Sequence, residues 1–147
     1  CSSDLYVSEL RELKMSVGDF PGYNSVRLSY NLLKLITSDQ NPSWKGALSN
    51  VAGVYVITDT QKGGQYVGSA YGGEGLWQRW QEYAKSGHGK NKDLKALLKS
   101  KGKDYSNNFQ FSILEICDLN ASEEIVLNRE IHWKEVLKTR EFGLNKN

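Results

Sequence analysis

Two charged side chains stand where the sequence pattern predicts apolar ones. Arg79 shares an i, i+3, i+4, i+7 helical face with Leu, Trp and Tyr residues, and Glu130 interrupts a similar stripe in a later helix. A buried guanidinium or carboxylate needs an opposite charge, a proton or a metal ion beside it. Tyr55 and Tyr66 fall on one face of a predicted β-hairpin, because side chains along a strand alternate between faces. Arginine binds phosphate bidentately, a carboxylate holds a hard divalent cation, and a hydroxyl orients or deprotonates water, so this set indicates phosphoryl chemistry.

Each of these side chains also has a simpler explanation. The two tyrosines could pack as part of a half-buried sheet face, and Arg79 could stack on Trp80 with its charged end in water. Glu130 could pair with Arg79 across the core. Helical spacing predicts that Glu82 lies on a different face from Arg79 and that Arg129 points away from Glu130. Several exceptions to local rules in one small domain nevertheless favour a functional site.

The strongest strand signals form a hairpin. Residues 52–58 and 65–69 are rich in β-branched and aromatic side chains, and the loop between them ends in two glycines. Gly53 and Gly68 carry no side chain, so the backbone on that face is predicted to be open to a ligand. Closing the loop at residues 59–64 predicts three cross-strand pairs: Thr58 with Gln65, Ile57 with Tyr66, and Tyr55 with Gly68.

Weaker patterns place the remaining elements. Residues 1–24 predict an amphipathic helix followed by a loop of turn residues, residues 26–28 a short strand, and Ser29 the N-cap of a helix. Further helices are predicted at 44–48, 75–85, 91–100 and 121–138, the last opened by a capping box of Asn120 and Glu123. A third strand is predicted at 109–116, and the tail is expected to be extended or a turn. This order predicts an α+β fold, a small antiparallel or mixed sheet with helices packed on it.

The composition is that of one globular domain. The chain has 147 residues, 39% hydrophobic and 24% charged, with two prolines, which excludes collagen-like and disordered classes. No apolar run approaches the roughly 20 residues of a membrane span and no secretory leader opens this stretch, so no membrane association is expected.

Two cysteines cannot form a disulfide framework, so a reduced, cytoplasmic setting is expected, with Cys117 a buried small hydrophobe. The histidines have no partner at ligand spacing, so no structural zinc site is predicted. Because residue 1 is Cys, we expect a fragment or a processed product.

A basic segment lies behind the small net charge of +2. Residues 85–103 hold seven lysines and one acid, Asp93, a local net charge of +6. Such a segment could attract a polyanion in a salt-dependent way, although a solvated, lysine-rich helix face is the simpler alternative. It contains no arginine, so it is predicted to hold a nucleic-acid backbone without reading sequence.

Taken in order, these residues resemble the GIY-YIG nuclease family. The two namesake motifs each have Val in place of Ile, and the match covers residues 50–147, with residues 1–49 as an extension packed on this nuclease domain. The motifs that carry the resemblance are Gly53-Val54-Tyr55, Tyr66-Val67-Gly68, Arg79-Trp80, Asn128-Arg129-Glu130 with Trp133, and Gly143-Leu144-Asn145.

The resemblance implies a Mg²⁺- or Mn²⁺-dependent DNA endonuclease built on a three-stranded antiparallel sheet flanked by helices. It implies Glu130 as the sole protein ligand of the metal, Arg79 on the scissile phosphate, and Tyr55 as the group that activates water. Tyr66 would support Tyr55, and Tyr83 would contact the phosphate or the water. The residues expected to bind substrate are Gly68, His88, Lys90, Lys92 and Asn145. A homodimer or an additional upstream domain stays open.

Two other functions compete with this one. A catalytically silent module that binds nucleic acid or protein could use the same fold, although Tyr55, Arg79 and Glu130 together argue against it. Alternatively, the glycine-rich stretch from Gly68 to Gly75 could cradle a phosphate ahead of a helix, although its spacing fits neither a P-loop nor a dinucleotide fingerprint.

Overall fold

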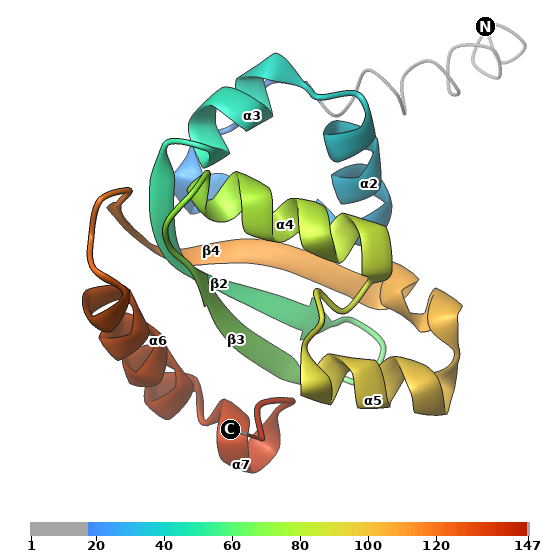
Figure 1. Cartoon of the computed structure of the whole chain (residues 1–147). Coiled ribbons are helices and arrows are strands. Elements are labelled where there is room, and N and C mark those ends of the chain that lie inside the picture. Colours follow the sequence, from blue (N-terminus) through green and yellow to red (C-terminus); the bar gives the residue numbers. More distant parts are fainter. Residues whose placement is uncertain (1–17, 147) are drawn as a thin grey trace, which may run out of the picture.

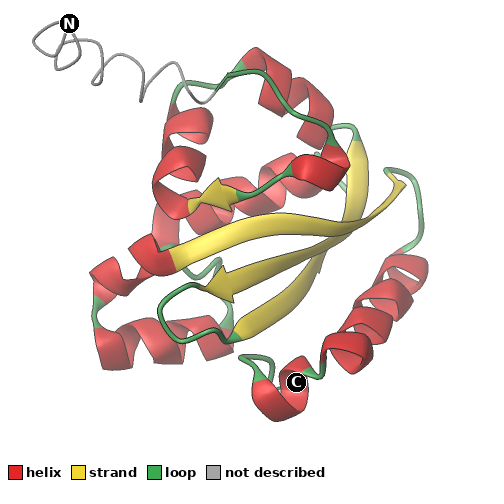
Figure 2. Ribbon diagram, turned by 180° about the vertical axis from the view of Figure 1, so that it is seen from behind, coloured by secondary structure: helices red, strands yellow, loops and turns green. Residues whose placement is uncertain are grey.

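Four strands form one antiparallel sheet in the computed structural model, which describes residues 18–146 (Figures 1 and 2). They are β1 (Leu28–Ser29), β2 (Val51–Asp59), β3 (Gln65–Ala70) and β4 (Phe109–Asp118), in the spatial order β1-β4-β2-β3. The predicted α+β class and antiparallel sheet are confirmed. The three-stranded sheet that the resemblance implied is wrong in strand number, because the chain before residue 50 adds β1, with Leu28 opposite Phe111.

The hairpin has the predicted register. Tyr55 lies opposite Gly68, Ile57 opposite Tyr66, and Thr58 opposite Gln65. The register is specified because a slip of one residue would move every buried side chain to the other face of the sheet.

Helices cover both faces of the sheet (Figure 1). Helices α2 (Tyr30–Ser38), α3 (Pro42–Leu48) and α4 (Gly75–Ser86) pack on one face, and α6 (Glu123–Leu137) packs on the other. Helix α5 (Lys92–Lys101) lies beyond the end of the sheet where β3 and β4 begin, and the 3-10 turn η2 (Lys103–Asn108) connects it to β4. The amphipathic helix predicted at the start of residues 1–24 lies outside the described residues. The loop predicted after it is present, since residues 18–24 form a loop and the start of the 3-10 turn η1 (Tyr23–Ser25).

Side-chain caps explain where several helices begin. Ser29 caps α2 as predicted, by accepting a hydrogen bond from the N–H of Leu32. Helix α3 begins at Pro42 rather than Trp44, because Asn41 caps it and proline suits the first helical position.

Two predictions about the C-terminal region are wrong. Ser122, not Asn120, caps α6 by accepting from the N–H of Ile125, while the N–H of Asn120 is held in a turn by Asp118. The tail contains the short helix α7 (Thr139–Phe142) where an extended segment or turn was expected. It can form because Lys138 adopts a left-handed backbone conformation that ends α6 and redirects the chain.

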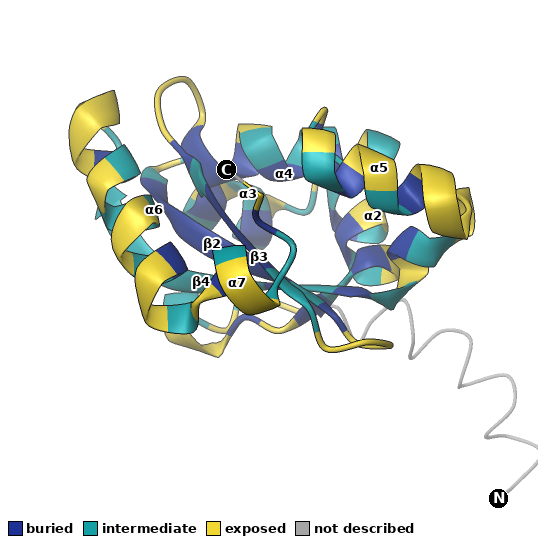
Figure 3. Ribbon diagram, turned by 90° about the horizontal axis from the view of Figure 1, so that it is seen from below, coloured by how far each residue is buried: buried dark blue, intermediate teal, exposed yellow. Residues whose placement is uncertain are grey.

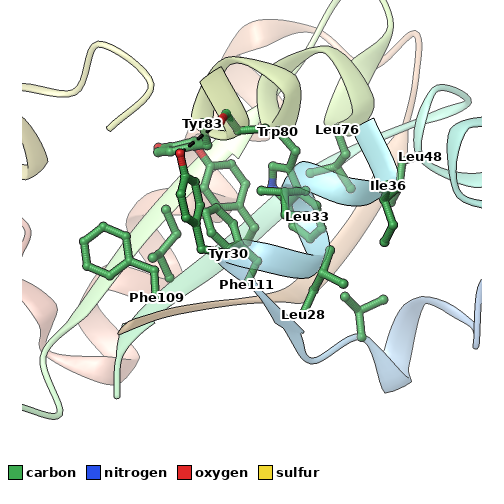
Figure 4. Close-up of a cluster of buried hydrophobic side chains, with 14 of the residues drawn as sticks. Leu28, Tyr30, Leu33, Ile36, Leu48, Leu76, Trp80, Tyr83, Phe109 and Phe111 are labelled. Carbon is green, nitrogen blue, oxygen red and sulfur yellow. Dashed lines mark hydrogen bonds between the residues drawn. The ribbon is translucent and has the colours of Figure 1, made fainter. Parts of the chain in front are cut away.

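The larger apolar cluster lies between the sheet and helices α2, α3 and α4 (Figures 3 and 4). Trp80 and Tyr83 of α4 contact the ring of Phe111 in β4 edge-on, with centroids 5.6 and 5.5 Å apart. Leu33 and Ile36 of α2 are buried in the same cluster. The described part of the extension therefore shares one core with the sheet.

A smaller cluster lies under α6 on the other face. Val54, Val56 and Val67 of the sheet are buried there, with Trp133 and Leu137 packed against them. Cys117 is only partly buried, contrary to the prediction, because it lies near the end of β4 beside exposed Asp118. Within residues 18–146, no helix combines the length and apolar content needed to cross a bilayer.

Candidate active site

A pocket of about 400 Å³ opens at the edge strand β3, between α4 and α6. Tyr55, Tyr66, Arg79 and Glu130 all line it, although they come from β2, β3, α4 and α6. The fold thus brings together the four side chains whose types indicated phosphoryl chemistry.

Both motif glycines allow close packing beside Tyr55. The β2–β4 pairing shifts register between Val54 and Tyr55, and a side chain at Gly53 would collide with the carbonyl of Glu115. A Cβ at Gly68 would lie 2.6 Å from the Tyr55 hydroxyl oxygen. The predicted opening at these two glycines is therefore wrong, because β4 and the Tyr55 ring fill the space. Gly68 still lines the pocket.

The hydroxyls of Tyr55 and Tyr83 form a hydrogen bond of 2.9 Å at the inner wall of the pocket. Both side chains are buried, and burial raises the pKa of each phenol above its usual value. Arg79 lowers the pKa of Tyr55, but burial outweighs it. Tyr83 is not in the pocket lining, and its hydroxyl contacts Tyr55 and Arg79, which are. Its predicted contact with phosphate or water stays a prediction.

Arg79 is fixed by groups on its own helix and on the following loop. Nη1 donates to Glu82 Oε1 and to the Gly89 carbonyl, both at 2.8 Å, and Nη2 donates to the Tyr83 hydroxyl at 3.4 Å. The predicted separation of Glu82 from Arg79 is wrong, since residues i and i+3 are neighbours on a helix. The Arg79 side chain is 25% exposed and lines the pocket, so the guanidinium can be reached from solvent.

Both oxygens of the Glu130 carboxylate have protein partners. Ser69 Oγ donates to Oε1 at 2.5 Å, and Lys134 Nζ pairs with Oε2 at 2.7 Å. Lys134 is 3% exposed and Glu130 is 15% exposed. Glu130 therefore pairs with Lys134, and not with Arg79 as the simpler explanation expected.

Sequence reasoning missed both partners of Glu130. The i, i+4 spacing from Glu130 to Lys134 is a signal that could have identified the ion pair. Ser69 follows Gly68 on β3, so its side chain points to the face covered by α6.

An ion pair holds α6 against β4. Arg129 Nε donates to both carboxylate oxygens of Glu115, at 2.9 and 2.8 Å, and Trp133 Nε1 donates to Oε1 at 2.9 Å. The hydrogen bond from Arg129 lowers the pKa of Glu115. Arg129 and Glu130 are adjacent on the helix and point apart, so binding Arg129 to β4 directs Glu130 toward β3 and the pocket.

The hydroxyl of Tyr66 accepts a hydrogen bond from Asn91 Nδ2. Asn91 Oδ1 caps α5 by accepting from the N–H of Asp93, which fixes the orientation of the amide. The Tyr66 hydroxyl can therefore point its own proton into the pocket. Burial raises the pKa of Tyr66, which keeps this hydroxyl a donor.

Asn145 and His88 do not line the pocket. Asn145 is buried and bonds both backbone groups of Val67, accepting from its N–H at 2.7 Å and donating to its carbonyl at 3.0 Å. His88 Nδ1 accepts from the N–H of Lys90 at 2.9 Å and so shapes the loop before α5; partial burial lowers its pKa. These two residues hold backbone in place, whereas the sequence placed them against substrate. Lys90 and Lys92 line a neighbouring pocket.

The turn after β3 does not form the phosphate cradle considered as an alternative. The N–H of Gly75 donates to the Gly72 carbonyl, and the N–H of Glu74 donates to the side chain of Gln78. These two backbone donors are therefore engaged within the turn and α4.

The donor set at Glu130 fits a hydrated divalent cation. A carboxylate has about four acceptor sites, and Ser69 and Lys134 use two of them. Within residues 18–146, no three His, Cys, Asp or Glu side chains gather into a ready-made metal cage. Mg²⁺ suits such a site because it keeps several waters and often binds through one or two carboxylates and substrate phosphates.

A family model described as the GIY-YIG catalytic domain matches residues 51–145. The chain belongs to the GIY-YIG family.

Two solved structures resemble the chain. The first is a mutant of the catalytic domain of the intron endonuclease I-TevI, with 26% identity and a TM-score of 0.50, covering 66% of this chain and 94% of that one. The second is the catalytic domain of the homing endonuclease I-TevI, with 28% identity and a TM-score of 0.48, covering 65% and 98%. No curated protein matches the chain. Its class is therefore that of a GIY-YIG-type endonuclease.

Proposed function

We propose that this protein hydrolyses DNA phosphodiester bonds with a single Mg²⁺ or Mn²⁺ held by Glu130. The convergence of Tyr55, Tyr66, Arg79 and Glu130 on one pocket carries the proposal. The similarity to an endonuclease catalytic domain supports DNA as the substrate. When bound, the cation would neutralise charge on the phosphate and on the leaving oxygen.

Arg79 binds the scissile phosphate in this proposal. In the free protein Glu82, which is 43% exposed, occupies one side of the guanidinium. Exposed ion pairs are worth little, so a phosphate can replace Glu82. The Gly89 carbonyl and the Tyr83 hydroxyl then keep the guanidinium in place.

As a phenolate, after its own proton has left to solvent, Tyr55 would orient the attacking water and accept a proton from it, which returns Tyr55 to the neutral phenol. Because burial raises the pKa of Tyr55, this phenol needs nearby positive charge to act as a base. Arg79 supplies part of that charge, and the 2.9 Å hydrogen bond to Tyr83 stabilises the phenolate. Tyr66 donates a hydrogen bond from its hydroxyl group to a phosphate oxygen or to the water and keeps its proton.

A catalytically silent, nucleic-acid-binding module is the second candidate function. The observation that favours it is the ion pair between Glu130 and buried Lys134, because a cation at Glu130 would have to bind beside an ammonium group. In this case the pocket would bind a phosphate without cutting it.

Digestion of single-stranded, duplex and branched DNA with Mg²⁺, Mn²⁺ or EDTA separates the two functions. The proposed nuclease produces metal-dependent cuts. The substrate that is cut fastest is the preferred DNA form, and mapping the ends locates the cleaved bond. DNA binding without cleavage in every metal condition would overturn the nuclease and leave the silent module.

A further inference from the structure

A second pocket of about 530 Å³ continues the site on the far side of Tyr66 and Arg79, which line both pockets. Its other walls come from the start of α5 and from the C-terminal tail. The residues that line it there are Lys90, Asn91, Lys92, Asp93 and Lys146. A chain of phosphates that passes Arg79 can therefore enter a second, lysine-rich hollow without leaving the protein surface.

Backbone contacts bring these lysines together. Lys90 has a φ of 63°, and its N–H donates to His88 Nδ1. The N–H of Lys146 donates to Asp93 Oδ2 at 2.9 Å, which ties the tail to the first turn of α5. The same contact gives Asp93, the acidic residue that lines this pocket, a hydrogen-bond partner. The three lysine residues are exposed.

Neither of these two pockets is lined by the other five lysines of the basic segment, which are Lys85, Lys95, Lys99, Lys101 and Lys103. Lys99 is seven residues beyond Lys92 on the same helix, which at 1.5 Å per residue places it about 10 Å further along α5. At 0.1 M salt this distance is about one Debye length, so its attraction for a phosphate in the second pocket is strongly screened.

We propose that Lys90, Lys92 and Lys146 form a flanking-phosphate site, which holds the DNA strand on one side only of the scissile bond. The proposal rests on the proposed function, because it takes Arg79 to mark the scissile phosphate. It divides the basic segment into an inner set that contacts the strand and an outer set that does not. It also adds Lys146, which is distant from that segment in sequence.

Two triple variants with the same change in charge test the site. In one, Lys90, Lys92 and Lys146 become Gln; in the other, Lys99, Lys101 and Lys103 become Gln. Binding of a fluorescein-labelled DNA duplex is measured in EDTA, which prevents metal-dependent cleavage, over about 50 to 200 mM salt. Each lost phosphate contact should reduce the slope of log K against log salt by about 0.9, so we expect a reduction of 2 to 3 for the inner variant and below about 1 for the outer one. All six side chains belong to exposed residues, and equal melting temperatures confirm the folds.

Ethylation interference supplies the directional test. For the wild type, we expect phosphates on one side of the cleavage position to be sensitive, and we expect the inner variant to lose that sensitivity. Equal slopes for the two variants, or sensitivity on both sides of the cut, would overturn the flanking site while leaving the nuclease proposal intact. Wild-type protein that neither binds nor cuts DNA would overturn the proposed function, and the flanking site with it.

Discussion

At the scale of single residues, we expect the planar geometry of the Arg79 guanidinium to matter as much as its charge. We predict that Arg79→Lys lowers kcat about 100-fold or more, because an ammonium group cannot hold a phosphate bidentately. Glu82→Gln should leave kcat unchanged and lower KM severalfold, because the competing carboxylate is removed. Steady-state cleavage kinetics measure both. A Glu82→Gln variant with lower kcat and unchanged KM would contradict the role of Glu82 as the group that phosphate replaces.

Lys134 is expected to oppose metal binding at Glu130. Replacing it with Met keeps an unbranched side chain one atom shorter and removes a positive charge 2.7 Å from the carboxylate. We predict that Lys134→Met binds Mn²⁺ at least about tenfold more tightly without DNA, a change of about 1.4 kcal/mol. Titration followed by electron paramagnetic resonance measures this affinity, with circular dichroism as the folding control. Weaker Mn²⁺ binding by a folded variant would show instead that Lys134 positions the carboxylate for the ion.

The sequence predicted which side chains gather at the pocket better than it predicted what they contact. Tyr55, Arg79 and Glu130 could be identified because each breaks a local pattern. Ser69 could not, since its contact with Glu130 depends on how α6 crosses the edge of the sheet. Tyr83 was expected to contact substrate because the family resemblance implied it, and only the packed structure shows that its side chain is buried and bonded to Tyr55.

At the scale of elements, Asn145 ties the tail to β3. Its side chain bonds the N–H and the carbonyl of Val67, the residue between Tyr66 and Gly68. Asn145→Ala would leave buried polar groups unpaired, which costs about 1–3 kcal/mol each. We predict a loss of about 2 kcal/mol in the free energy of unfolding, measured by urea denaturation, with faster hydrogen exchange at Val67.

The matched control for Asn145 is Lys146→Ala, whose backbone contact to Asp93 is retained and whose side chain is exposed. This variant should keep wild-type stability. If Asn145→Ala were as stable as the wild type but raised KM for DNA, the result would contradict this structural role and support the substrate contact predicted from the sequence.

The sequence predicted element types well and some boundaries poorly. The position of the closing loop at residues 59–64 specifies the β2–β3 register, so those pairs follow from local information. The start of α6 was misplaced because Asn120 and Ser122 can both act as caps. The short strand predicted at residues 26–28 is present as β1, shifted to Leu28–Ser29, because those two residues are the ones that pair with β4.

At the scale of the whole molecule, the division of the chain into residues 1–49 and 50–147 stays a prediction. The two parts share one core, so we do not expect residues 50–147 to fold alone. Leu33, Ile36, Trp44 and Leu48 precede residue 50 and are all buried in the main cluster. Losing one large core side chain costs about 2–5 kcal/mol, and total stabilities are about 5–15 kcal/mol. We predict that a fragment 50–147 aggregates or binds a hydrophobic dye, whereas a fragment 18–147 melts cooperatively. Cooperative melting of the shorter fragment at the same Tm would contradict this.

The convergence of the site could not be derived from any one segment. The pocket needs the edge position of β3, α4 on one face and α6 on the other, and this arrangement exists only in the folded chain. The family resemblance supplied that arrangement as an expectation, and the folded chain shows how Gly53, Gly68 and the Glu115–Arg129 pair produce it.

Cleavage of supercoiled plasmid by the wild type and by Glu130→Gln, with Mg²⁺ or with EDTA, tests the central claim most directly. The amide keeps the shape of the carboxylate and removes the charge that would hold the cation. We predict metal-dependent nicking by the wild type, a loss of at least about 100-fold in Glu130→Gln, and nearly unchanged DNA binding by that variant. Cleavage by Glu130→Gln at the wild-type rate would contradict the account.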